Sequence, residues 1–251
     1  MNKTLIVVTL TFAAAVCAHA TATTHIWGPS TDVQAFNVWH ITADYYLPTE
    51  RTPAGARIPP VTNTGLTVGI LPLTLLNAEV GIDHKSGLGP LDDYPLYFNG
   101  KIATPENGMA AFFPAVAVGI FDVGTRRDKT TNDVAYGEIA KTLGTMQRNL
   151  GRLSVGWFTG NKSLLLDARS HTDDNGVIAA WERTMNEISP KLWLCMEYLG
   201  TQSSYGTFNF GGSWKFADNM DVLLGYDVYN NADLPPTFTV QVDVDFSLKG
   251  K

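Results

Sequence analysis

The chain has 251 residues with a formal net charge of −6, and 17% of its residues are charged. This length allows one large domain or two small ones. A mildly acidic chain without a basic cluster argues against a nucleic acid partner. No apolar run after residue 20 reaches the roughly 18 residues of a membrane-spanning helix, which excludes a helical membrane protein.

Residues 1–20 have the organisation of a secretory signal peptide, with one lysine, an apolar run over 5–16 and a small-residue cleavage site over 18–20. Removing this segment takes away one positive charge, which shifts the net charge from −6 to −7. It also leaves Cys195 as the only cysteine, so no intrachain disulfide can form. Cys17 leaves a lipoprotein as an alternative, although a bulky residue precedes it.

After the signal peptide we expect a polar, irregular lead-in over 21–32 at the periplasmic rim. Alternating apolar and polar residues then predict β-strands, since successive side chains of a strand point to opposite faces. Segment 112–121 is apolar on both faces and contains Pro114, which is awkward in a paired strand. The alternatives for this segment are a helix or, if the strands close into a barrel, a plug inside the barrel. The expected strands span 33–46, 62–71, 75–84, 94–102, 112–121, 133–142, 149–159, 177–184, 190–200, 205–216, 220–229 and 237–246.

The last three strands show the alternation most clearly. In 237–246, Val240, Val242 and Val244 alternate with polar residues, and Phe246 ends the strand. An apolar row facing out and a polar row facing in is the signature of a transmembrane β-barrel. The stretch resembles a bacterial outer-membrane β-barrel protein. That resemblance implies a Gram-negative outer-membrane location, lipid and the barrel-insertion machinery as partners, and Phe246 as the insertion signal, although residues 247–251 follow it.

The connections also fit this architecture. With the N-terminus in the periplasm, the outer connections are mostly longer than the inner ones, and an even strand count returns the C-terminus to the periplasm. The predicted fold is an all-β, antiparallel up-and-down transmembrane barrel over 33–246, with a tail over 247–251. Twelve strands are expected, and ten or fourteen are the alternatives.

A soluble, lipocalin-like barrel would turn the same apolar row inward. About eight strands is the number whose side chains can fill a barrel interior, so twelve strands with an apolar interior would leave a wide void. A secreted protein of two packed β-sheets remains the other alternative.

The polar row of each strand predicts the lining of the lumen. Acidic residues outnumber basic ones in it, and charged rings select ions by sign, so a water-filled pore would weakly favour cations. In a closed scaffold the same charges would simply pair across neighbouring strands. The candidates for this lining are Asp44, Glu79, Asp83, Lys101, Arg152, Lys191, Glu197, Lys215, Asp221, Asp227, Asp243 and Asp245.

Catalytic and metal-binding patterns are weak. A barrel hydrolase needs a serine and a histidine held together, and only His84 near Ser86 and His171 beside Ser170 come close. Residues 173–176 lack the ligand spacing of a calcium loop. We therefore expect no catalytic residue, metal or cofactor, and a porin-like channel for small solutes or ions. The alternatives are a non-conducting structural or adhesion barrel that binds through its outer loops, and an outer-membrane lipid-modifying hydrolase.

Overall fold

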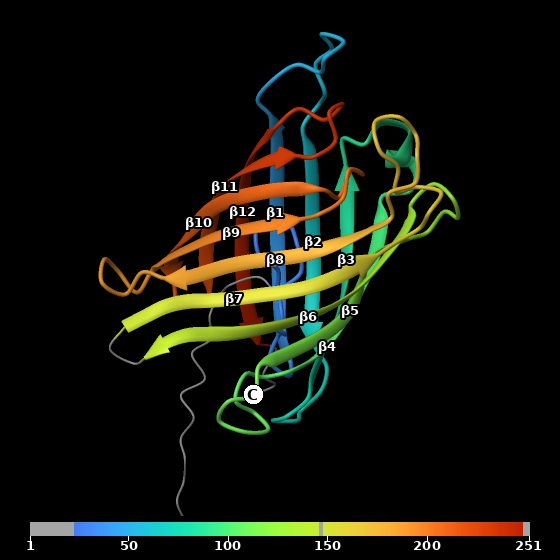
Figure 1. Cartoon of the computed structure of the whole chain (residues 1–251). Helices are drawn as coiled ribbons and strands as arrows, with labels where there is room; N and C mark the ends of the chain where they lie inside the picture. The colour runs from blue at the N-terminus through green and yellow to red at the C-terminus, as the bar shows by residue number, and fades with distance from the viewer. Residues whose placement is uncertain (1–22, 146–147, 248–251) are drawn as a thin grey trace, which may run out of the picture.

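The computed structural model describes residues 23–145 and 148–247; the predicted signal peptide 1–20 and most of the tail 247–251 lie outside these ranges. The described residues form a closed antiparallel barrel (Figure 1). None of their helices is long and apolar enough to cross a membrane. The elements are β1 (Val38–Pro48), β2 (Val61–Gly69), β3 (Asn77–Ser86), η1 (Gly89–Asp93), β4 (Leu96–Thr104), β5 (Ala115–Gly124), β6 (Thr131–Thr145), β7 (Arg148–Thr159), β8 (Asn175–Thr184), β9 (Leu192–Leu199), β10 (Thr207–Ala217), β11 (Met220–Tyr229) and β12 (Thr237–Ser247).

Each strand pairs with its neighbours in sequence, and β1 pairs with β12 from Val38 opposite Ser247 to Pro48 opposite Thr237. This last pairing leaves no free sheet edge, which removes the aggregation hazard that edges carry. The predicted up-and-down barrel of twelve strands is confirmed. The helical alternative for 112–121 is wrong: β5 begins just after Pro114, so the missing N–H of the proline interrupts no strand pairing.

The two faces of the strands differ as the alternation predicts. In β7, Val155 and Trp157 point outward and are 59% and 54% exposed, whereas Ser154 and Phe158 point inward and are each 1% exposed. The apolar row therefore covers the outside of the barrel, and the soluble barrel with an apolar interior is wrong.

The connections divide the barrel into two ends. We call one the loop end; it carries 49–60, 87–95, 125–130, 160–174, 200–206 and 230–236. We call the other the turn end; among the described residues it carries 70–76, 105–114, 185–191 and 218–219.

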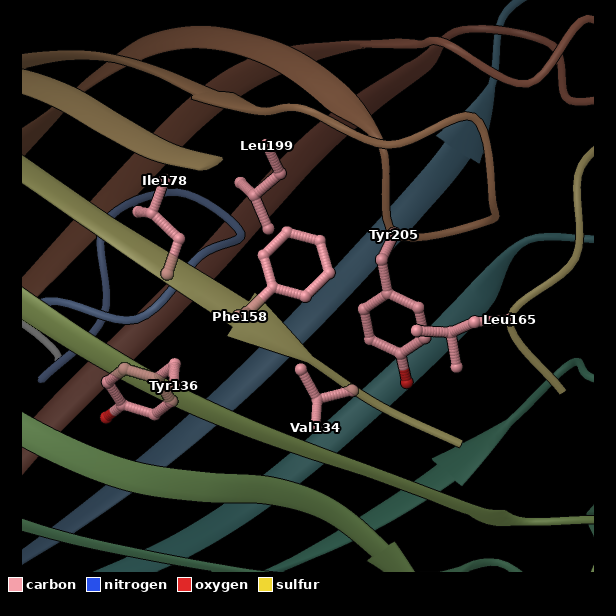
Figure 2. Packing of buried hydrophobic residues seen from close by; sticks show 7 residues of the cluster. All are labelled: Val134, Tyr136, Phe158, Leu165, Ile178, Leu199 and Tyr205. Atoms are coloured by element: carbon pink, nitrogen blue, oxygen red, sulfur yellow. The ribbon is translucent and has the colours of Figure 1, made fainter. Parts of the chain in front are cut away.

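One part of the interior is apolar, which the sequence pattern did not predict. Figure 2 shows side chains of neighbouring strands meeting two side chains from the loop end inside the barrel. This inner apolar cluster fills the lumen beside β6 to β9 and closes that side by ordinary core packing. Its members are Val134, Tyr136, Phe158, Ile178 and Leu199 from the strands, and Leu165 and Tyr205 from the loops.

The apolar outer face predicts a strong response to an outward charge. Val155 lies near the middle of β7 and points outward. An arginine there should lower the free energy of unfolding in lipid vesicles by about 2–4 kcal/mol, because it must be placed in hydrocarbon. Urea unfolding of Val155→Arg, with Val155→Leu as the matched control, measures this. Equal stability of the two variants would contradict a lipid-facing position.

Candidate functional site

The described N-terminal residues lie inside the ring of strands, where they are drawn in blue in Figure 1. We call residues 23–37 the inner segment. It starts as a small hairpin in which Thr24 pairs with Pro29 and the His25 N–H donates to the Gly28 carbonyl at 2.9 Å. From residue 23 onward, the expected lead-in over 21–32 thus fills part of the lumen.

Glu197 of β9 holds the tip of this hairpin. The backbone N–H groups of Trp27 and Gly28 donate to its carboxylate at 2.5 and 3.1 Å, and the Asn209 side chain donates at 2.7 Å. Glu197 is 2% exposed. A buried carboxylate needs such donors to offset its lost hydration, so the tip and the wall stabilise each other.

Lys101 of β4 holds the base of the hairpin. Its ammonium donates to the carbonyls of Thr23 at 2.5 Å and Ser30 at 3.1 Å, and also to the carbonyl of Asp32. It forms a buried salt bridge with Glu79 at 3.3 Å. One charged group thereby fixes three points of the inner segment.

The inner segment then crosses the turn end of the lumen. Arg152 of β7 binds Asp32 at 2.9 Å, and the Gln34 N–H donates to Glu79 of β3 at 2.8 Å. Beyond this point the backbone lies against β2, where a Cβ on Gly69 would stand only 2.1 Å from the Ala35 carbonyl oxygen. The segment therefore spans from one wall of the barrel to the other.

A cavity of about 550 Å³ occupies the remaining lumen, and we call it the vestibule. It reaches from residues of the loop end down to Glu79 and Lys101, and the inner segment forms part of its lining through Ile26, Trp27 and Pro29. Its walls come mainly from β1 to β5, and Tyr136 and Tyr205 of the inner apolar cluster border it on the other side. The lumen is thus filled on one side and hollow on the other.

Four predicted lining residues line the vestibule: Glu79 and Lys101, described above, and also Asp44 and Asp83. Asp44 accepts hydrogen bonds from Thr42 at 2.5 Å and Asn63 at 3.0 Å. Asp83 accepts from Asn63 at 3.3 Å and Asn99 at 2.8 Å. Among the described residues neither carboxylate forms a salt bridge, and their hydrogen-bond donors are all neutral. The Lys85 ammonium attracts Asp83 from beyond salt-bridge distance.

A further charged pair in the vestibule was missed by the sequence reasoning. The Lys85 ammonium lies 2.5 Å from the Asp122 carboxylate, which also accepts from the Tyr205 hydroxyl. Lys85 has the same parity as Asp83, but the predicted strand ended one residue too early. Asp122 faces inward because β5 has an irregularity between Phe121 and Val123, with a φ of 54° at Asp122.

The remaining acidic candidates lie apart from the vestibule. Asp243 and Asp245 contact the two ring nitrogens of His40 at 3.1 and 2.8 Å, and Asp221 stands directly opposite Asp243. Asp227 accepts from the Thr237 and Thr239 hydroxyls.

The last two basic candidates lie near the turn end. Lys191 is exposed and precedes β9, so its predicted place inside strand 190–200 is wrong. Lys215 is half-buried in β10, opposite Asp221.

Within the described part of the chain, neither His84 nor His171 forms a side-chain hydrogen bond with a serine. His84 is exposed on the outside of β3. His171 is exposed in a loop, 3.4 Å from Asp167. Hydrogen bonds from the backbone N–H groups of His171 and Arg169 hold the pKa of Asp167 below its ordinary value. Within the same residues, no group of three or more metal-ligating side chains is arranged around a common point.

No protein-family model and no curated protein sequence matches this chain. Among solved structures, the KdgM porin has a TM-score of 0.50 at 8% identity, over 84% of this chain and 99% of that chain. The NanC porin has a TM-score of 0.45 at 10% identity, over 84% of this chain and 100% of that chain. A triple mutant of the Rhodopseudomonas blastica porin has a TM-score of 0.41 at 13% identity, over 73% of this chain and 55% of that chain, so the match spans about half of that porin. At such low identities the comparison shows similarity of fold alone. The KdgM match confirms that this chain resembles outer-membrane barrels in fold.

Proposed function

We propose that this chain is an integral outer-membrane β-barrel of a Gram-negative bacterium and serves as a porin-like channel for small solutes. The observation that carries the proposal is the vestibule of about 550 Å³ inside a closed barrel whose outer face is apolar. The fold likeness to the KdgM porin supports it. Solute passage is a matter of size, charge and hydration, so no residue is assigned covalent chemistry.

The inner segment acts as the gate of this channel. It lies between the vestibule and the turn end, and passage requires that it move. Lys101, Glu197 and Arg152 hold it through contacts to its backbone and to Asp32. The pairing of the twelve strands does not depend on these contacts. The barrel therefore stays closed when the inner segment undocks.

In this proposal, charged residues that line the vestibule determine the ion selectivity of the channel. Asp44 and Asp83 line it without a salt bridge, whereas Lys85 and Lys101 are each paired with a carboxylate. A permeating cation therefore meets carboxylates that form no salt bridge, which gives the weak cation preference. Phe246, near the end of β12, is the proposed signal for the insertion machinery.

A non-conducting structural barrel is the second candidate, and the same inner segment favours it. In that case the segment and the inner apolar cluster are permanent fillings, and binding takes place at the loop end.

Single-channel recording in a planar bilayer with a salt gradient separates the two candidates. The refolded chain 21–251 should give steps with a cation-selective reversal potential. Gly69→Ala should weaken docking of the inner segment by about 1–3 kcal/mol through steric overlap, which raises the open probability roughly tenfold. Gly137→Ala is the matched control, because its added Cβ has only ordinary contacts, the nearest at 3.9 Å.

Folding of each preparation is checked by heat-modifiable migration in electrophoresis. A folded barrel that gives no steps, either as wild type or as Gly69→Ala, would favour the structural barrel.

A further inference from the structure

We infer that the vestibule binds a small organic cation with an aromatic or apolar body. This inference rests on the proposed function, since it names the solute class of the same cavity. A volume of about 550 Å³ falls within the range of roughly 300–1,000 Å³ that is usual for small-molecule sites.

The positive charge of the ligand follows from the unpaired carboxylates. Asp44 and Asp83 accept hydrogen bonds only from hydroxyl and amide groups, and Asn63 donates to both. Lys85 follows two residues after Asp83 on the same strand and attracts it, but the Lys85 ammonium forms its salt bridge with Asp122. Asp44 is buried, and buried charges are normally paired. An ammonium group in the vestibule would supply the counter-charge that Asp44 lacks, and the half-buried Asp83 would add to the attraction.

An anionic ligand finds no comparable partner. The His40 ring, which also lines the cavity, is held by Asp243 and Asp245. The Lys85 ammonium is held by Asp122, and the Lys101 ammonium is held by Glu79 and three carbonyl oxygens. Lys129 also lines the cavity but is exposed at the loop end, over the ring of Tyr94. Solvent screens its charge.

Three neighbouring aromatic rings, one of them close to Asp44, suit a quaternary or protonated amine. Trp27 is nearly perpendicular to Tyr46 and to Tyr229, with ring centroids 5.2 and 6.1 Å apart. All three line the vestibule, and Tyr46 follows Asp44 by two residues, which places both on the inner face of β1 roughly 7 Å apart. Aromatic faces attract such cations, most strongly where water is excluded.

The apolar rim of the vestibule is the reason to expect an apolar body in the ligand. The loop end contributes aliphatic and proline side chains to the cavity where a mouth for ions alone would be polar. These are Ile58, Pro59, Leu88, Leu91, Leu234 and Pro235.

Calorimetric titration of the refolded chain 21–251 tests the inference with three probes of one ring type. Benzyltrimethylammonium is positively charged, benzyl alcohol is neutral and benzoate is negatively charged. We expect saturable binding of benzyltrimethylammonium, binding of benzyl alcohol at least about tenfold weaker, and no binding of benzoate. Equal binding of the cationic and neutral probes, or no binding of the cation, would overturn the inference.

Two isosteric variants locate the site. Asp44→Asn and Asp83→Asn keep a side-chain oxygen for the neighbouring donors, and each should weaken benzyltrimethylammonium by at least about tenfold, because the coulombic attraction of one carboxylate is lost. Binding of benzyl alcohol should stay unchanged. Asp218→Asn, an exposed position at the turn end, should change neither. Unchanged cation affinity in both folded vestibule variants would place the binding elsewhere and refute the assignment.

Conductance of the same preparations separates this inference from the proposed function. If the chain gives conductance steps but does not bind benzyltrimethylammonium, the channel proposal stands and the inference of an organic cation as ligand is refuted. Asp44-dependent binding without steps would retain the cation site in a barrel that does not conduct.

Discussion

Lys101→Met is expected to raise the open probability of the channel by about a hundredfold or more. The substitution leaves Glu79 buried without its salt-bridge partner and leaves the carbonyls of Thr23 and Ser30 without the ammonium donor. Removing one partner of a buried ion pair costs about 3–5 kcal/mol, and each 1.4 kcal/mol is a factor of about ten in an equilibrium. Most of this loss falls on the docked inner segment, which single-channel recording measures directly.

Lys141→Met is the matched control. Lys141 forms a salt bridge with Glu106 at 3.1 Å at the turn end and donates to Asn107 at 2.7 Å, and neither partner belongs to the inner segment. Its open probability should equal that of the wild type. If Lys101→Met folds and its open probability also stays at the wild-type value, the inner segment does not control conduction.

Phe158→Ala is expected to lower the free energy of unfolding by about 3–5 kcal/mol, the usual cost of emptying a packed phenylalanine site. Phe158 is 1% exposed and is surrounded by the inner apolar cluster, including Ile178 and Leu199. The loss includes burial of the ring and the cavity that it leaves. Urea unfolding of the barrel in detergent, followed by the change in heat-modifiable migration, gives the value.

Phe216→Ala makes the same chemical change on the outside of β10, where the ring is 59% exposed. Its stability in detergent should fall by less than about 1 kcal/mol, as for most surface substitutions. Equal losses in the two variants would mean that the cluster is not a packed core.

The charged residues of the lumen could be predicted from the sequence only where the inward and outward side chains of a strand alternate regularly. Asp44, Glu79 and Glu197 are buried as their alternation indicates, because a strand in a closed barrel has one inner and one outer face. Asp122 could not be found in this way, since an irregularity with a φ of 54° turns it inward out of register. The prediction that Lys191 lies within a strand was wrong for a simpler reason, because β9 begins one residue after it.

The sequence by itself determined the architecture of this protein. Period-2 alternation fixes which residues share a face, and twelve such segments with short connections admit few arrangements other than an up-and-down barrel. Only the tertiary structure decided what the barrel contains. The inner segment has no periodicity, and its place depends on Lys101, Arg152 and Glu197, which lie on three strands far apart in sequence. Such contacts arise from closure of the barrel, so no local pattern encodes them.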